Sequence, residues 1–141
     1  MQPAPIIFVL MRDNLRYNII VKLIKPKEEA MRILVVEDDQ MIREGISEYL
    51  SEFGYTIIEA GDGKQALEKF NKDINLVILD IQIPFINGLE VLREIRRTSK
   101  LPILILTAFS DEEYKIEAFT NLADGYIEKP FSLPVLKARV D

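Results

Sequence analysis

The chain contains no cysteine and no histidine. Without these residues it cannot form disulfides, use a thiol nucleophile, build the usual zinc sites or perform histidine catalysis. Carboxylates, hydroxyls, lysine and arginine are therefore the groups left for chemistry. A chain without cysteine also fits the cytoplasm, and this is the compartment that we expect.

Long hydrophobic runs are absent as well. The longest apolar runs are Ile6 to Met11 and Pro102 to Leu106, whereas a transmembrane helix needs about 20 such residues. The first eleven residues have no basic leading region, so they do not resemble a secretory signal. We expect a soluble protein that has no membrane partner.

Basic residues are in the minority, since 18 basic and 23 acidic residues give a net charge of −5 at pH 7. The acidic residues are unevenly distributed, because residues 1–30 have a net charge of +2 and residues 31–141 have a net charge of −7. An acidic body repels phosphate backbones, so we expect no direct binding of nucleic acid by this chain.

A length of 141 residues, with 48% apolar residues, suits one globular domain. From Met31 onward, short apolar runs rich in β-branched residues alternate with segments of helical period, which is typical of βα units around a parallel sheet. The predicted strands are Arg32 to Glu37, Tyr55 to Ala60, Leu76 to Asp80, Ile103 to Thr107 and Gly125 to Glu128. The first, third and fourth are continuously apolar, which predicts burial on both faces and a central place in the sheet.

Five helical segments separate or follow these strands. They are Met41 to Phe53, a segment around Ala66, Leu67 and Phe70, one with Leu89, Leu92 and Ile95 that opens after Asn87 and Gly88, Asp111 to Leu122, and a last one with Leu133, Leu136 and Val140. Strict alternation predicts an α/β fold with a doubly wound, five-stranded parallel sheet of flavodoxin-like order 2-1-3-4-5 and right-handed crossovers.

Polar residues gather where the predicted strands end. They are Glu37, Asp38 and Asp39 after the first strand, Asp80 at the end of the third, Thr107 at the end of the fourth, and Lys129 after the fifth. Each has an ordinary explanation alone, and Asp39 suits a helix cap. Parallel strands share one direction, so these ends meet at one edge of the sheet. Clustered carboxylates there require a cation, and Mg²⁺ suits oxygen ligands of this kind.

Four motifs at these positions, taken in order and spacing, resemble the receiver domain of two-component response regulators. They are ILVVEDD at 33–39, LDIQIPFING at 79–88, ILTA at 105–108 and YIEKPF at 126–131. The resemblance covers residues 31–141. Further motifs at 118–119, 123–126 and 129–139 resemble the winged-helix subfamily of transcription factors, the OmpR/PhoB-like group.

The resemblance implies that Asp80 accepts a phosphoryl group from a sensor histidine kinase. It further implies a Mg²⁺ site in which Asp38 is a direct ligand, Glu37 acts through water, and Asp80 and the main-chain carbonyl of Gln82 complete the protein's share. Such a domain is a regulatory phosphoacceptor that assists its own phosphorylation and dephosphorylation, rather than an enzyme. A carboxylate nucleophile yields an acyl phosphate.

The resemblance also implies roles for the remaining strand-end residues. Lys129 would contact the phosphoryl oxygens, Thr107 would move to bond one of them, and Tyr126 matches the aromatic switch residue. The bond from Lys129 to Pro130 is a candidate cis peptide. Phosphoryl transfer needs positioning and charge neutralisation, which Mg²⁺ and Lys129 can supply.

Residues 1–30 lie outside the resemblance. Two β-rich runs there, Ile6 to Met11 and Tyr17 to Ile24, suit either a hairpin or a translated leader or cloning remnant. Residues 31–141 are expected to be a receiver domain that stops within its last helix. DNA would be contacted only through a winged-helix output domain that this sequence lacks.

The subfamily forms homodimers through the fourth helix, fifth strand and fifth helix, and the resemblance implies the same here. Lys115, Asp124 and Arg139 fit the charged pairs of that interface, while Val135 and Asn121 depart from it. At least one intersubunit ion pair is therefore in doubt.

Other readings fit less well. A phosphatase of the haloacid dehalogenase type needs a second Asp two residues after the nucleophile, where Gln82 stands. A flavodoxin binds phosphate after the first strand, where three acids would repel it. A degenerate receiver lacks the acidic pair, the threonine or the lysine, all of which are present. A stand-alone receiver that acts as a protein interaction module remains the alternative.

Overall fold

Five parallel strands form a sheet in the order β2-β1-β3-β4-β5, as the sequence predicts. The structure is a computed structural model that describes residues 30–108 and 122–141. The strands are β1 (Arg32–Val36), β2 (Thr56–Ala60), β3 (Leu76–Asp80), β4 (Ile103–Thr107) and β5 (Gly125–Glu128). Every residue of β3 and β4 is buried, and so are the last four of β1. The prediction that these three strands are central is confirmed.

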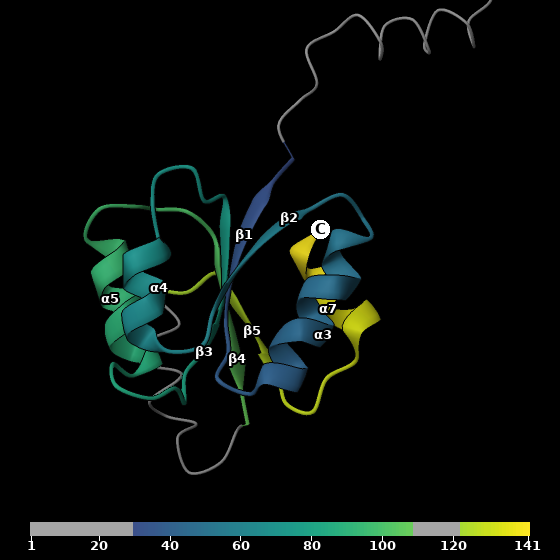
Figure 1. Cartoon of the computed structure of the whole chain (residues 1–141). Coiled ribbons are helices and arrows are strands. Elements are labelled where there is room, and N and C mark those ends of the chain that lie inside the picture. Colours follow the sequence, from purple (N-terminus) through teal and green to yellow (C-terminus); the bar gives the residue numbers. More distant parts are fainter. Residues whose placement is uncertain (1–29, 109–121) are drawn as a thin grey trace, which may run out of the picture.

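Helices cover both faces of the sheet (Figure 1). The helices α4 (Gly63–Lys69) and α5 (Gly88–Arg96) lie on one face, and α3 (Gln40–Ser51) and α7 (Leu133–Val140) lie on the other. Side chains alternate between two apolar clusters, because successive strand residues point to opposite faces. Leu34 and Val36 join the α4 and α5 side, whereas Ile33 and Val35 join the α3 and α7 side.

Short polar side chains start each of these helices. The caps are Asp39 for α3, Asp62 for α4, Asn87 for α5 and Ser132 for α7, and each accepts a hydrogen bond from a backbone N–H three residues later. Each bond satisfies one of the free N–H groups of a first turn. The prediction that Asp39 is a helix cap is confirmed.

Three predicted elements have bounds that differ from those in the structure. The first strand ends at Val36 rather than Glu37, and the second begins at Thr56 rather than Tyr55. The first helix runs from Gln40 to Ser51 rather than from Met41 to Phe53. The chain turns at Gly54, where φ is 93°, a value that glycine adopts without a steric penalty.

Two predicted segments lie outside the described residues. These are the N-terminal runs at 6–11 and 17–24, and most of the helix predicted at 111–122. Within the described ranges, none of the helices has the length and apolar character required to cross a membrane.

Arg96 joins three segments at the edge where β4 and β5 begin. Its Nε donates to the carbonyl of Leu122 at 2.6 Å, and its Nη1 donates to that of Leu101 at 2.6 Å. Its Nη2 lies 2.9 Å from Asp124 Oδ2, which also accepts the N–H of Ile103 at 2.7 Å. Asp124, which fits a charged pair of the expected dimer, therefore already has partners within its own chain.

Candidate functional site

Three carboxylates and one ammonium group meet at the carboxyl edge of the sheet. Glu37 and Asp38 follow β1, Asp80 ends β3 and Lys129 follows β5. Oxygens of the three acids all lie within 4.8 Å of one another. The Nζ of Lys129 is 2.6 Å from Glu37 Oε1 and 3.0 Å from Asp80 Oδ2. The structure thus brings together the acids and the lysine that the sequence places at separate strand ends.

Glu37 is fully buried, and both its carboxylate and its main chain have hydrogen-bond partners. Its Oε1 accepts from Lys129, and its Oε2 accepts the N–H of Asp39 at 3.2 Å. Its own N–H donates to the carbonyl of Ala60 at 3.1 Å. A buried carboxylate is costly unless it is paired and hydrogen-bonded, and this one is both. Asp38, the next residue, is exposed.

Asp80 is 4% exposed and also has a partner on each carboxylate oxygen. Oδ2 accepts from Lys129, while Oδ1 accepts the backbone N–H of Gln82 at 3.1 Å. The Gln82 contact is therefore made through its N–H, and the role of its carbonyl as a metal ligand stays a prediction.

The loop after Asp80 is closed by Gly88. The N–H of Gly88 donates to the carbonyl of Ile81 at 2.9 Å. A Cβ at Gly88 would lie 2.5 Å from both the carbonyl oxygen of Asp80 and the Cα of Ile81. Real atoms do not approach so closely, so only glycine lets α5 begin directly against the main chain of the central aspartate.

Thr107 and Tyr126 lie on the two neighbouring strands β4 and β5. Thr107 is buried, and its carbonyl accepts the N–H of Lys129 at 2.6 Å. Tyr126 is opposite Ile105 in the sheet and is 42% exposed. The peptide between Lys129 and Pro130 is cis, as the sequence motif predicts. The switch roles of Thr107 and Tyr126 stay predictions.

Burial and mutual repulsion shift the pKa values of this cluster. Burial raises the pKa of Glu37, and the charge of Asp80 adds to this effect, while the hydrogen bond from Lys129 opposes it. The pKa of Asp38 is also raised, by partial desolvation and by its neighbour Glu37. Burial alone would lower the pKa of Lys129, but its hydrogen bonds to Glu37 and Asp80 outweigh this and raise it. The ammonium is therefore firmly charged.

The acids fit a small divalent cation. Three carboxylates and one ammonium leave a formal charge of −2 at this edge. Oxygens that share one Mg²⁺ at about 2.1 Å lie at most about 4.2 Å apart, so side chains now within 4.8 Å need to move little. The donors are all hard oxygens, which Mg²⁺ prefers.

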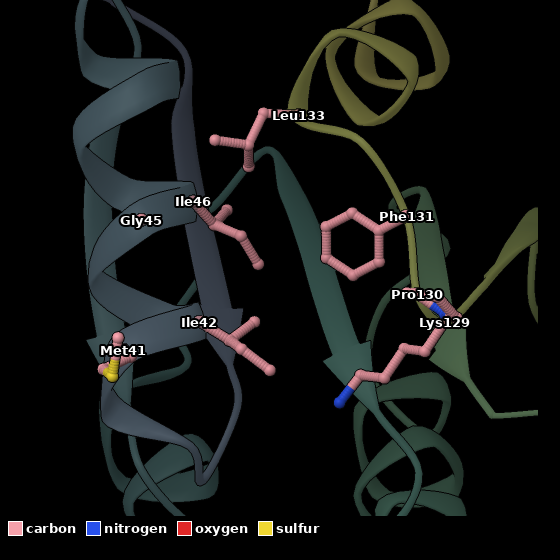
Figure 2. A pocket seen from close by; sticks show the side chains of 8 residues that line it. All are labelled: Met41, Ile42, Gly45, Ile46, Lys129, Pro130, Phe131 and Leu133. Atoms are coloured by element: carbon pink, nitrogen blue, oxygen red, sulfur yellow. The ribbon is translucent and has the colours of Figure 1, made fainter.

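An apolar cavity of about 490 Å³ lies beside the acids, between α3 and the segment that leads into α7. Figure 2 shows Ile42 and Ile46 on α3 facing Phe131 and Leu133 across it. Lys129 belongs to both places, since its stem lines the cavity while its amine reaches the acids. Lys129 is therefore the residue that connects this apolar cavity to the acid cluster.

Sequence reasoning missed Arg43 and Glu59. The side chain of Arg43 reaches from α3 to the carbonyl of Glu37 and to the carboxylate of Glu59 on β2. No motif marks this contact, because it depends on how β2 is placed beside β1. The only available signal was a basic residue in the first turn of a helix that follows an acidic pair.

The protein family described as the response regulator receiver domain has a sequence model that matches residues 33–141 of this chain. The chain belongs to the response regulator receiver family. Response regulator RR06 of Streptococcus pneumoniae is 44% identical over 111 residues, which are 78% of this chain and 51% of RR06. The transcriptional regulatory protein YrkP of Bacillus subtilis is 48% identical over 79% of this chain and 48% of YrkP. The chain thus spans about half the length of these curated relatives.

Solved receiver structures agree with this membership. The response regulator TrrA of Thermotoga maritima, solved in complex with Mg²⁺ and BeF, is 44% identical with a TM-score of 0.68, and the match covers 78% of this chain and 96% of that one. DrrB of the same organism, described as an OmpR/PhoB homologue, is 33% identical with a TM-score of 0.70, over 79% of this chain and 51% of that one. The predicted resemblance to receivers of the OmpR/PhoB type is confirmed.

Proposed function

We propose that this receiver takes a phosphoryl group from a sensor histidine kinase onto Asp80, with Mg²⁺ as its cofactor. The observation that supports this best is the placement of Lys129, whose amine contacts both Glu37 and Asp80. A lysine so placed marks where negative charge must be neutralised. Asp80 is the nucleophile because it ends a central strand between the acidic pair and Thr107.

In the proposed step, a carboxylate oxygen of Asp80 attacks the phosphorus of a phosphohistidine. The new O–P bond forms as the N–P bond breaks, and the electron pair of that bond returns to the imidazole nitrogen. Lys129 stays positively charged and turns from the carboxylates toward the transferred oxygens. Bound Mg²⁺, held by Asp38 and Asp80 with Glu37 behind them and the Gln82 carbonyl beside them, would neutralise charge on the phosphoryl group.

The kinase is proposed to dock on the cavity beside Lys129. The cavity is lined by apolar side chains and by Lys129, which also contacts Asp80, so a helix with an apolar stripe can pack there while it presents its phosphohistidine to Asp80. Met41 is 84% exposed at the rim of the cavity, although it is large and apolar. Gly45 has open space where a side chain would be, which leaves room for a partner.

Phosphorylation is proposed to change the face made by the segment predicted as the fourth helix, β5 and α7, with Thr107 and Tyr126 as the switch residues. Added charge and acceptor oxygens at Asp80 draw Thr107 toward them. Tyr126 is half exposed on that face, so a change in its position alters the surface that a partner meets.

This face is also the proposed site of homodimer formation, and through it the receiver would control a DNA-binding output domain. Val135 is 53% exposed on α7, so an apolar contact can replace the acid that is usual there. Lys115 and Asn121, which the expected interface also uses, lie outside the described residues. The receiver domain is proposed to begin near residue 31, with residues 1–30 outside it.

Acetyl phosphate tests the core of this proposal. Incubation with acetyl phosphate and MgCl₂ should add one phosphoryl group by mass, and EDTA or Asp80→Asn should abolish the gain. Asp73→Asn is the matched control, since this exposed aspartate precedes β3 and belongs to no cluster of the site. An unmodified wild-type protein, or a modified Asp80→Asn variant, would refute the assignment.

The docking proposal has its own test. Gly45→Leu fills the cavity without touching the acids, so it should slow transfer from phosphorylated kinase cores severalfold but leave labelling by acetyl phosphate unchanged. Gly45→Ala, which adds only a methyl group, is the control. Equal slowing with both donors would show that the substitution damages the site itself.

A further inference from the structure

Arg43 connects the acidic loop to the edge strand of the sheet. It lies in the first turn of α3, and its side chain is only 18% exposed. Its Nη1 donates to the main-chain carbonyl of Glu37 at 2.9 Å, and its Nε lies 3.0 Å from Oε1 of Glu59 on β2. The guanidinium thus contacts the peptide group between Glu37 and Asp38, whose side chains form the acidic pair.

The surroundings of this guanidinium are shaped to receive it. A Cβ at Gly61 would lie 3.1 Å from Arg43 Nη1, so the absence of a side chain there leaves the space that the guanidinium fills. The main chain of Glu59 is held as well, because its carbonyl accepts a hydrogen bond from Lys69 Nζ at 2.5 Å. The planar fork of arginine bonds two acceptors at once, which lysine cannot do with the same geometry.

These contacts fix the main chain that carries the acidic pair, Glu37 and Asp38. The N–H of Glu37 is bonded to Ala60, and its carbonyl is bonded to Arg43. The peptide that follows it carries Asp38, whose side chain is exposed. The direction of that side chain therefore depends on the orientation of the peptide that Arg43 holds.

We propose that Arg43, held by Glu59, is a positioning residue that orients the Glu37–Asp38 peptide so that the acidic pair binds Mg²⁺. This inference rests on the proposed function of the same site. Groups that orient metal ligands from outside typically contribute 10- to 100-fold to metal affinity. Arg43 acts through one peptide group rather than through a ligand side chain, so we expect the low end, roughly tenfold.

Mg²⁺ titration by NMR tests this inference, with the amide signals of Asp38 and Asp39 as the readout. Arg43→Met should raise the Kd for Mg²⁺ roughly tenfold, Glu59→Gln should raise it by a smaller factor, and Arg43→Lys should lie between Arg43→Met and wild type. The double variant Arg43→Met/Glu59→Gln should be no worse than Arg43→Met alone. The control is Arg97→Met, which removes an exposed arginine that pairs with Glu94 on the surface of α5.

Acetyl phosphate kinetics separate positioning from general damage. At saturating MgCl₂, Arg43→Met should be phosphorylated at the wild-type maximal rate, with only the MgCl₂ concentration for half-maximal rate raised. An unchanged Kd in Arg43→Met, or in Glu59→Gln if the first variant does not fold, overturns the inference, and so does a lowered maximal rate with an unchanged Kd. Wild-type protein that binds no Mg²⁺ would instead overturn the proposed function.

Discussion

Asp38→Asn should make the metal-free protein more stable while it weakens Mg²⁺ binding. The pKa of Asp38 is raised by desolvation and by Glu37, which means that the folded state disfavours its charge. A raised carboxylate pKa costs stability at neutral pH, because the folded state holds a proton more tightly than the unfolded state does. Removal of the charge removes this cost.

The magnitude follows from the geometry of the acids. Two unit charges 4.8 Å apart repel by about 0.9 kcal/mol in water and by about 3.5 kcal/mol at an effective dielectric constant of about 20. Asp38 is exposed, so the lower figure applies, and attraction to Lys129 offsets part of it. We expect a gain of about 0.5 kcal/mol in the free energy of unfolding.

Urea denaturation followed by far-UV circular dichroism measures both effects. In EDTA the variant should be more stable than wild type. In MgCl₂ at ten times its Kd, wild type gains about 1.4 kcal/mol and should overtake the variant, which gains less. Asp39→Asn is the matched control, since asparagine caps α3 equally well. A destabilised Asp38→Asn in EDTA, or an equal gain in Asp39→Asn, would refute the reasoning.

Three further predictions concern stability. Gly45→Ala should stabilise the protein by about 0.5 to 1 kcal/mol in urea unfolding, because alanine suits a helix interior better and its methyl group meets nothing within 4 Å. Gly88→Ala should destabilise it by about 1 to 3 kcal/mol in the same assay, because a Cβ there clashes with the main chain of Asp80 and Ile81; an undisturbed Gly88→Ala would contradict the described loop. The raised pKa of Lys129 means that its stabilising contribution is complete below the ordinary value of 10.5 and is lost as the pH rises through its higher folded value. Urea midpoints above pH 10 should therefore fall more steeply in wild type than in Lys129→Met, and parallel curves would disprove the pairing.

Much of the fold could be predicted because the central strands are continuously apolar. The bounds of β3 and β4 agree with the sequence-based prediction, since burial on both faces gives each strand a continuous run of apolar residues. Phe53 was misleading. It continues the apolar stripe of α3 but lies beyond its end, half exposed, with its ring 5.2 Å from that of Tyr49 and 4.4 Å from Lys137 Nζ.

The sequence was sufficient to predict those site residues that lie at the ends of strands. Asp80 and Lys129 are found this way, because topology alone brings parallel strand ends to one edge. Arg43 could not be predicted, because its partners are the carbonyl of Glu37 and a carboxylate 16 residues away on a neighbouring strand. Such contacts follow from the exact placement of β2, which no periodicity in the sequence encodes.

The contacts of Arg96 hold the edge of the sheet where β4 and β5 begin more firmly than the opposite edge, where these strands end. One guanidinium ties the end of α5 to the segments that lead into β4 and β5, far from the charged edge. If Thr107 and Tyr126 act as the proposed switch, we expect them to tilt β4 and β5 about these anchored ends rather than to shift the two strands as a whole. The proposed signal from Asp80 would then change the outer face most near the carboxyl ends of these strands and least near Arg96.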